Sequence, residues 1–349
     1  MSRPHDAHDM TSGGWSRGSL FARVLGVAMV GMAVAGFLIG HQAEDGEARV
    51  GPGGVLSFER VTCTSTDPGE TCTTDIWSVN VDSGSQKRLT RKPTGEGEEA
   101  GWSPDGRRLA FVGRGYQIWT MNADGSRQEQ LTVSEGLKSA PTWSPRGHRI
   151  AYGDEDRLMA MNALGDALSR LATVAGPVWE ASWSPDGRRI VFSAGSSSFI
   201  YVVNANGRGL RQLGRGNLDE DPWSSDGRHI LLWLPGPGAL YVLSADGKTR
   251  RRLAGNAAEA DWSPDGKRIV FVQGAFGPNA EIYVTNADGS SKRRLASGGQ
   301  PQWSPDGRQI AFSEGEGSVG AVYMINADGT HRRTLVGDGQ TPLWQPVRR

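Results

Sequence analysis

Short runs of apolar residues alternate with polar turns from about residue 50 onward, and the arrangement returns every 39 to 41 residues. Each full repeat reads W-S-P-D-G or a near copy, then an apolar run, a variable loop and a second apolar run. A-D-G or a variant follows, and then a basic stretch that ends in Leu. This period is typical of short β-strands that form stacked or radially arranged blades. The register is marked by Trp102, Trp143, Trp183, Trp223, Trp262, Trp303 and Trp344.

The turn residues indicate how many strands each repeat contains. In S-P-D-G, Pro fixes the first central φ, Asp bonds back to the backbone and Gly adopts the left-handed conformation. The segments Asn122–Gly125, Asn286–Gly289 and Asn326–Gly329 are equally tight hairpin signals. We therefore expect four strands: one that ends at the Trp, one after P-D-G, one before A-D-G and one after it. The Trp side chains should pack between neighbouring sheets rather than form a ladder that stacks on a ligand.

The two ends of the repeat region complement each other. Residues 54–90 contain the runs VLSFER, DIWSVNV and QKRLT but no strand that leads into a Trp. The C-terminal segment TPLWQPV supplies such a strand and nothing after it. Pairing of these segments would close a ring and leave only short protected edges. Six full repeats and one split repeat predict seven blades over residues 54–346; six blades with a loosely attached N-terminal hairpin is the alternative.

The repeated WSPDG…IAF…IYVMNADG…RRL pattern resembles the TolB-like β-propeller repeat, which is similar in layout to WD repeats. The resemblance covers nearly all of residues 54–346, and its motifs recur in register. It implies an all-β propeller of four-stranded blades that serves as an extracytoplasmic binding or scaffold domain. TolB itself has six blades and a separate N-terminal α/β domain, whereas this chain has a seventh unit and no room for that domain.

One apolar segment precedes the repeats. Val24–Gly40 contains 17 uncharged residues, close to membrane-spanning length. Arg17 and Arg23 lie before it, and the first basic residue after it is Arg49. The positive-inside rule predicts a cytoplasmic tail (1–23), a transmembrane signal-anchor helix (24–40), a linker (41–53) and a propeller outside the cytoplasmic membrane. The alternative is a cleaved signal peptide that leaves a secreted propeller.

The chain contains two cysteines, Cys63 and Cys72, nine residues apart across a Pro-Gly turn. Within one hairpin they are placed to form a disulfide, the state favoured in an oxidising compartment. A metal-binding pair or two free thiols are the alternatives, although this spacing without other Cys or a nearby His is a weak metal pattern.

Charge is balanced in total but separated in space. With 38 Lys and Arg against 38 Asp and Glu, the chain lacks the basic excess of a nucleic-acid-binding protein. Acidic residues gather in the variable connections, many of them three residues before a Trp, at the start of the innermost strand. They could surround the mouth of the central channel and attract cations or a basic peptide. The alternatives are solvated loop carboxylates, or caps on the backbone of a neighbouring blade. The candidate partner-binding residues are Glu99, Glu180, Glu220, Glu259, Asp219, Asp221 and Asp261.

Basic residues follow the A-D-G turns, as in Arg250–Arg252 and Lys292–Arg294. Lys and Arg on outer strands discourage pairing with another sheet. Contact with anionic headgroups or wall polymers is a second interpretation.

No catalytic constellation stands out. The six His show no ligand spacing of the H-x3-H kind, and the G-x-S-x-G match at Gly14–Gly18 lacks a strand–turn–helix context. The acidic loops lack the spaced D-x-D-x-D-G pattern, so no cofactor is expected and Ca²⁺ is a minor possibility.

The sequence therefore predicts a non-enzymatic, monomeric, membrane-anchored propeller that binds a protein or peptide at its acidic face and binds no nucleic acid. One alternative is a propeller enzyme, a metal-assisted lyase or hydrolase acting on a polysaccharide or lactone. Another is a structural or sensory ectodomain of the cell envelope.

Overall fold

A computed structural model describes residues 54–66, 69–90, 100–234, 238–274, 279–316 and 319–346 of the chain. They belong to one compact unit, Glu44–Arg349, and within these ranges the secondary structure is 27 strands and no helix. The predicted tail, anchor and linker lie outside the described residues. Within those residues, no helix is long and apolar enough to cross a membrane.

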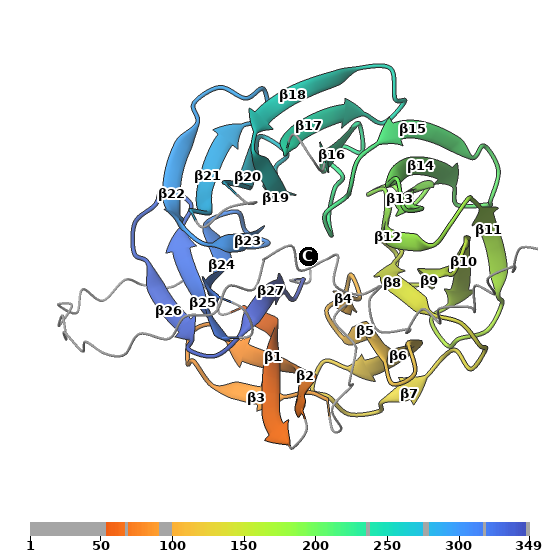
Figure 1. Cartoon of the computed structure of the whole chain (residues 1–349), viewed down its shortest axis with the longest axis horizontal. Helices are drawn as coiled ribbons and strands as arrows, with labels where there is room; N and C mark the ends of the chain where they lie inside the picture. Colours follow the sequence, from red (N-terminus) through yellow and green to blue (C-terminus); the bar gives the residue numbers. More distant parts are fainter. Residues whose placement is uncertain are drawn as a thin grey trace, which may run out of the picture. The chain divides into compact units, whose positions relative to one another are not determined.

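Seven sheets surround one axis, as predicted, and are numbered here as blades 1 to 7 (Figure 1). Blade 1 contains β27 (Gln340–Trp344), β1 (Val55–Thr66), β2 (Gly69–Asn80) and β3 (Gln86–Arg88); blade 2 contains β4 (Ala100–Trp102), β5 (Arg108–Gly113), β6 (Gln117–Asn122) and β7 (Glu129–Gln130). Blade 3 contains β8 (Lys138–Trp143), β9 (Arg149–Asp154), β10 (Arg157–Asn162) and β11 (Ser169–Thr173); blade 4 contains β12 (Val178–Trp183), β13 (Arg189–Ala194), β14 (Phe199–Asn204) and β15 (Arg211–Arg215). Blade 5 contains β16 (His229–Leu234), β17 (Ala239–Ser244) and β18 (Arg250–Gly255); blade 6 contains β19 (Ala257–Trp262), β20 (Arg268–Gln273), β21 (Glu281–Asn286) and β22 (Arg293–Ser297). Blade 7 contains β23 (Gly299–Trp303), β24 (Gln309–Glu316), β25 (Val319–Asn326) and β26 (Arg333–Val336).

The ring closes by pairing of the two ends of the propeller, which confirms the prediction made from the split repeat. In blade 1, β27 pairs with β1, and Leu56 lies opposite Trp344. The Ser57 hydroxyl donates to the Leu343 carbonyl at 3.2 Å and accepts from the Trp102 indole N–H at 3.0 Å. The closing strand pair is therefore also bonded to blade 2.

Blade 5 differs from the predicted four strands. Its sheet has three strands, and the innermost segment makes only the isolated bridges Asn217–Trp233 and Trp223–Ile230. Pro222 lies in this segment and has no N–H with which to extend a ladder. Residues 219–221 therefore run toward the axis as a loop rather than as a strand.

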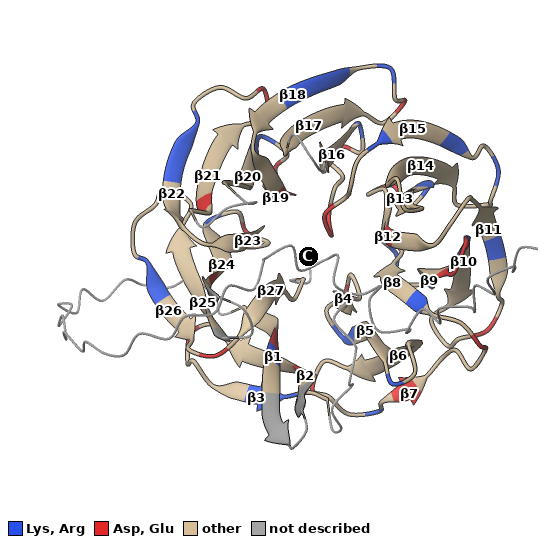
Figure 2. Ribbon diagram, in the orientation of Figure 1, with Lys and Arg blue, Asp and Glu red and all other residues tan. Residues whose placement is uncertain are grey.

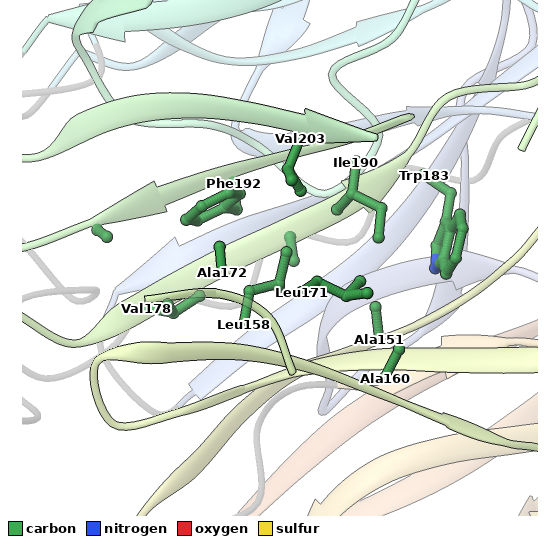
Figure 3. Packing of buried hydrophobic residues seen from close by; sticks show 12 residues of the cluster. Ala151, Leu158, Ala160, Leu171, Ala172, Val178, Trp183, Ile190, Phe192 and Val203 are labelled. Atoms are coloured by element: carbon green, nitrogen blue, oxygen red, sulfur yellow. The ribbon is translucent and has the colours of Figure 1, made fainter. Parts of the chain in front are cut away.

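The repeated Trp residues lie between blades and are only 4–8% exposed, which confirms them as core. Trp183, for example, packs with Ile190, Phe192 and residues of the neighbouring blade (Figure 3). Its indole N–H donates to the Thr142 carbonyl of blade 3 at 3.3 Å. From the same blade, the Arg149 guanidinium lies 5.5 Å from the Trp183 ring centroid. The boundary between blades 3 and 4 thus combines apolar burial with directed polar contacts.

The basic outer strands also join blades. Arg251 donates to the Asp288 carbonyl, and Arg293 to the Ala327 carbonyl, in each case at the turn of the next blade. The Arg250 guanidinium lies 3.9 Å from the ring centroid of Tyr241 on its own blade. These residues therefore stabilise the ring, a role that the sequence analysis did not assign to them.

Candidate functional site

Three consecutive blades carry the acidic residues that the sequence singled out. Glu180 lies on β12, Glu259 and Asp261 lie on β19, and residues 219–221 form the loop before β16. Figure 2 shows acidic residues on this loop, close to the axis of the ring. We call these six the acidic cluster: Glu180, Asp219, Glu220, Asp221, Glu259 and Asp261. The remaining candidate, Glu99, lies outside the described residues.

In blades 1, 3, 6 and 7 the residue three before the Trp has a positive φ next to a shift in strand register. The register of β19 against β20 shifts between Ala258 and Asp261, and Glu259 adopts a φ of 51°. Gln300 and Thr341, at the same position of later repeats, have φ values of 52° and 53°. Bulges re-aim side chains, and here they direct this position toward the next blade.

Three of the carboxylates cap backbone N–H groups of the next inner strand. Asp219 accepts from Ala260 N–H at 2.8 Å, and Glu259 accepts from Gln300 N–H at 2.7 Å. Asp261 accepts from Trp303 N–H at 2.7 Å. The capping alternative therefore holds for these three residues.

The same contact is made without charge elsewhere in the ring. The amide oxygen of Gln300 accepts from Thr341 N–H at 3.1 Å and from the Ser313 hydroxyl at 2.7 Å. A neutral side chain is thus sufficient for this cap, and the carboxylates of blades 5 and 6 carry charge beyond what the cap requires.

The environment of the acidic cluster opposes ionisation. Burial raises the pKa of Glu180 to about 7, against the hydrogen bond from the Ser193 hydroxyl. Burial and the charges of Glu259 and Glu180 raise the pKa of Asp219 to about 7. Burial raises the pKa of Asp261 well above its ordinary value, and the negative charges on Asp221 and Glu220 act in the same direction. Negative charge in this cluster is therefore poorly compensated.

The poor compensation follows from the missing countercharges. Within the described part of the chain, no Lys, Arg or His forms an ion pair with Glu180, Asp219, Asp221, Glu259 or Asp261. Gln302, from blade 7, donates to the Glu220 carboxylate at 3.3 Å and brings a neutral group to the cluster.

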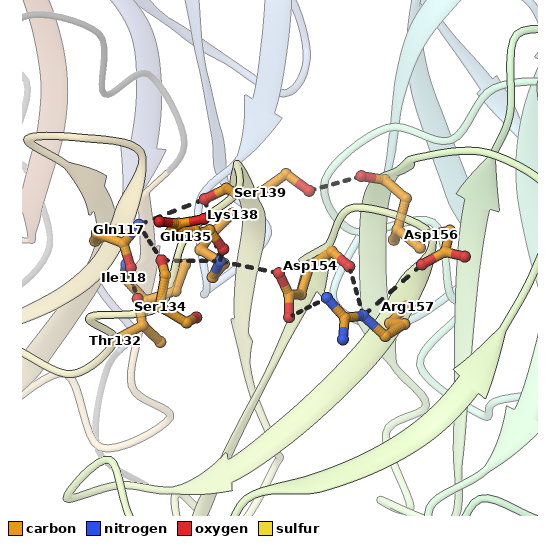
Figure 4. A network of polar contacts seen from close by, with 12 residues as sticks. Gln117, Ile118, Thr132, Ser134, Glu135, Lys138, Ser139, Asp154, Asp156 and Arg157 are labelled. Atoms are coloured by element: carbon orange, nitrogen blue, oxygen red, sulfur yellow. Dashed lines mark hydrogen bonds and ion pairs between the residues drawn. The ribbon is translucent and has the colours of Figure 1, made fainter.

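Another acidic residue on the same face is neutralised by the protein itself (Figure 4). Lys138 is fully buried, and its ammonium lies 2.9 Å from the Asp154 carboxylate. It also donates to the carbonyls of Glu135 at 2.8 Å and Gly136 at 3.1 Å. Arg157 lies 3.2 Å from the other Asp154 oxygen. The sequence analysis missed this pair, although Lys138 stands five residues before a Trp, where other described repeats have Val178, Leu218, Ala257, Gly298 and Gly339.

Two further predictions bear on chemistry. Among the described residues, no group of three or more His, Cys, Asp or Glu is arranged to hold a metal ion. Cys63 lies directly opposite Cys72 in the register of β1 and β2, but the two side chains are outside the described part of the structure.

Comparison with known proteins places this geometry in a family. The family model for the TolB beta propeller domain matches residues 113–348. The Tol-Pal system protein TolB of Geobacter sulfurreducens is 39% identical over 74 residues, which are 20% of this chain and 17% of that protein. The chain thus spans less than a third of the length of the curated relatives it matches.

Solved structures share the fold. The crystal structure of TolB from Acinetobacter baumannii superposes with a TM-score of 0.50 at 16% identity, over 83% of this chain and 82% of that one. An oligogalacturonate lyase in complex with manganese gives a TM-score of 0.59 at 15% identity, over 76% of this chain and 85% of that one. Propellers of this shape therefore include proteins of different functions.

Proposed function

Because this chain belongs to the TolB β-propeller family, we propose that it is a non-enzymatic cell-envelope propeller that binds a protein or peptide partner through the acidic cluster. One observation carries the proposal: five carboxyl side chains on three adjacent blades have no ion-pair partner among the described residues. The ring itself does not need that charge, since Gln300 makes the equivalent cap as a neutral amide. The G. sulfurreducens relative is named as a protein of the Tol-Pal system, which supports a protein partner.

The ligand that such a cluster favours is a Lys or Arg side chain on an exposed segment of the partner. Each carboxylate has two oxygens, and in Asp219, Glu259 and Asp261 one oxygen is already fixed by a backbone N–H. In Glu259 the other oxygen is held in place for a cationic donor, whereas Asp219 has a second hydrogen bond with the Trp233 side chain and Asp261 one with the Trp262 backbone. Charge-assisted hydrogen bonds to a preorganised carboxylate are about twice as strong as neutral ones.

Binding of a cation should be linked to proton release. The pKa values of Glu180 and Asp219 lie at about 7, so both groups are partly protonated near neutral pH. A bound ammonium or guanidinium favours the ionised form and displaces those protons. Affinity should therefore rise with pH through about 7, and fall at high salt because the attraction is electrostatic.

The proposed location is the extracytoplasmic side of the membrane, with Val24–Gly40 as the anchor. In that compartment we propose a disulfide between Cys63 and Cys72. Directly opposed residues of antiparallel strands have Cα atoms about 4.5–5.5 Å apart, within the range that a disulfide spans. Mass spectrometry of the alkylated chain before and after reduction tests the bond, and the mass of the mature N-terminus tests retention of the anchor.

Crosslinking followed by purification from membranes tests the partner site. We compare the unmodified chain with the double variant Glu180→Gln/Glu220→Gln, which removes two ionisable groups and retains hydrogen-bonding capacity. The control, Asp105→Asn/Asp288→Asn, removes two charges from turns on the opposite face. The acidic-cluster variant should lose the captured protein and the salt dependence of capture, and the control should retain both.

Identical capture profiles for the two variants would reject the acidic cluster as the binding site. Stoichiometric divalent metal on the purified chain, lost in Glu259→Gln, would instead indicate the metal-assisted lyase or hydrolase class, in which case the proposal fails.

A further inference from the structure

The face opposite the acidic cluster is formed by the P-D-G turns, which join the first and second strands of a blade, and by the A-D-G turns, which join the third and fourth. We call it the turn face. Both ends of the described propeller lie on it. The Gly54 carbonyl accepts from Val81 N–H, in the turn between β2 and β3, at 3.0 Å. The Gln345 amide donates to the Gly106 carbonyl, in the P-D-G turn of blade 2. The described propeller therefore begins at the turn face, at Gly54.

Most of the turn face is lined with carboxylates. Four blades have Asp in both the P-D-G and the A-D-G turn: Asp105 and Asp124, Asp226 and Asp246, Asp265 and Asp288, Asp306 and Asp328. The Ser126 hydroxyl holds the pKa of Asp124 below its ordinary value, and Ser290 does the same for Asp288. These carboxylates are therefore ionised at neutral pH, and basic residues of the same turns balance them: Arg107 and Arg308 each lie 3.9 Å from the carboxylates of Asp105 and Asp306.

Blades 3 and 4 depart from this pattern at neighbouring turns. Arg146 replaces the P-D-G Asp of blade 3, and Leu164 and Asn206 replace the A-D-G Asp of blades 3 and 4. Leu164 is 71% exposed, and Leu168, four residues later, is 61% exposed.

The equivalent of Leu168 in blade 4 is Leu210, which is 41% exposed. Other blades have Gln, Arg or Lys at this position, as in Gln128, Arg250 and Lys292. We call the exposed residues of these turns the leucine sector: Arg146, Leu164, Leu168, Arg188, Arg208 and Leu210.

The leucines are not required by the turns that carry them. In blade 3, the Asn162 side chain accepts hydrogen bonds from the backbone N–H groups of Leu164 and Asp166, each at 2.9 Å. The Leu164 side chain takes no part in these hydrogen bonds. The same turns also carry two exposed carboxylates, Asp166 and Asp186, so the basic excess of the sector over other blades comes from Arg146 and from the two missing A-D-G carboxylates. Exposed leucines combined with this excess form a surface that matches an anionic and partly apolar one.

We propose that the leucine sector docks on the anionic surface of the membrane that holds Val24–Gly40. The 13 residues from 41 to 53 can span at most about 45 Å, so in the anchored chain of the proposed function the turn face is within reach of the bilayer. Leucines enter the interfacial region and the neighbouring arginines pair with lipid phosphates. The docking rests on the anchor of the proposed function but not on the acidic cluster, which lies on the opposite face.

Hydrogen exchange of the full chain in lipid nanodiscs tests the docking. We compare discs of phosphatidylcholine with discs of phosphatidylcholine and phosphatidylglycerol, and follow exchange in turns 162–170 and 204–211, with turn 286–292 of blade 6 as internal reference. Exchange of the first two turns should slow in the anionic discs alone, the protection should disappear at high salt, and the reference turn should not change.

The variant Arg146→Asp/Leu164→Asp/Asn206→Asp restores the residue that four other blades have, so it should not disturb folding. It makes the charge of the sector more negative by four. Each charge near an anionic surface changes the equilibrium constant for membrane contact about fivefold, so the variant should reduce docking roughly a hundredfold or more. The control, Asp265→Asn/Asp288→Asn in blade 6, should leave the protection intact.

Equal exchange of turns 162–170 and 204–211 in both kinds of disc would overturn the docking, as would equal protection of the reference turn or no effect of the triple variant. Failure of the full chain to copurify with discs would also overturn it. None of these results affects the partner capture assigned to the acidic cluster, so the two proposals fail separately.

Discussion

Glu180→Gln should make the propeller more stable at alkaline pH while it weakens partner binding. Glu180 has an ordinary pKa of 4.5 and a folded-state pKa of about 7. Because the folded value is the higher one, the folded state holds its proton longer than the unfolded state as pH rises. The unmodified chain therefore loses stability between about pH 4.5 and 7, and the Gln variant does not.

The magnitude follows from linkage. At 1.36 kcal/mol per pH unit, a rise from 4.5 to about 7 corresponds to roughly 3 kcal/mol when the carboxylate is fully ionised. The side chain is half-buried, so solvent screening reduces this, and we expect a stabilisation of about 1–2 kcal/mol at about pH 8. Gln keeps the hydrogen bond with Ser193, since the hydroxyl can donate to or accept from the amide.

Urea unfolding followed by Trp fluorescence, at pH values from about 4 to 8.5, measures the difference. The two chains should have equal stability at the acidic end and diverge as pH rises. Asp124→Asn is the control: the Ser126 hydroxyl lowers the pKa of Asp124 below its ordinary value of 3.8, so this variant should be less stable than the unmodified chain by the same amount across the whole range. That difference should shrink only below about pH 4, where the unmodified chain loses the stability that ionised Asp124 contributes. Parallel curves for Glu180→Gln and the unmodified chain across the whole range would refute the reasoning, because Glu180 would then ionise normally.

Three further changes test the packing of the ring. Trp183→Ala should cost about 3–5 kcal/mol in urea unfolding, because it empties the boundary between blades 3 and 4, whereas Val133→Ala at an exposed position should cost almost nothing. Lys138→Met should lower the free energy of unfolding by about 3–5 kcal/mol, because it leaves the buried Asp154 with Arg157 alone. Lys248→Met removes an exposed pair with Asp246 and should lower it by less than about 1 kcal/mol. Similar losses in the two variants would contradict a special role of the buried pair. Deletion of residues 340–349 should expose β1 to proteolysis and abolish cooperative unfolding, and a cooperative transition would show that closure by β27 is dispensable.

Local chemistry is what made the fold predictable. The S-P-D-G and A-D-G turns specify hairpins within a few residues, and the Trp period fixes the register of one blade against the next. The missing strand before Val55 and the unused strand at Trp344 then leave ring closure as the consistent solution, which the pairing of Leu56 with Trp344 confirms.

Contacts between repeats were not predictable in the same way. Glu259 caps Gln300 across 41 residues, and this contact depends on a bulge and on the angle between two blades, neither of which a single repeat encodes. The sequence therefore left capping and partner binding as alternatives, although the structure allows one carboxylate to do both. The lost strand of blade 5 did have a local signal: Pro222 stands directly before Trp223, whereas the Pro residues of inner strands that do form (Pro141, Pro301 and Pro342) stand two residues before the Trp.

Side chains of opposite charge link neighbouring blades on the two faces of the ring. On one face, carboxylates such as Asp261 accept from the N–H groups of the next blade. On the turn face, arginines such as Arg149 and Arg251 donate to carbonyls of the next blade. The caps of the first kind can be neutral, as Gln300 shows, so the links between blades do not require carboxylates at Asp219, Glu259 and Asp261, and their ionisation remains available for binding a cation as proposed above.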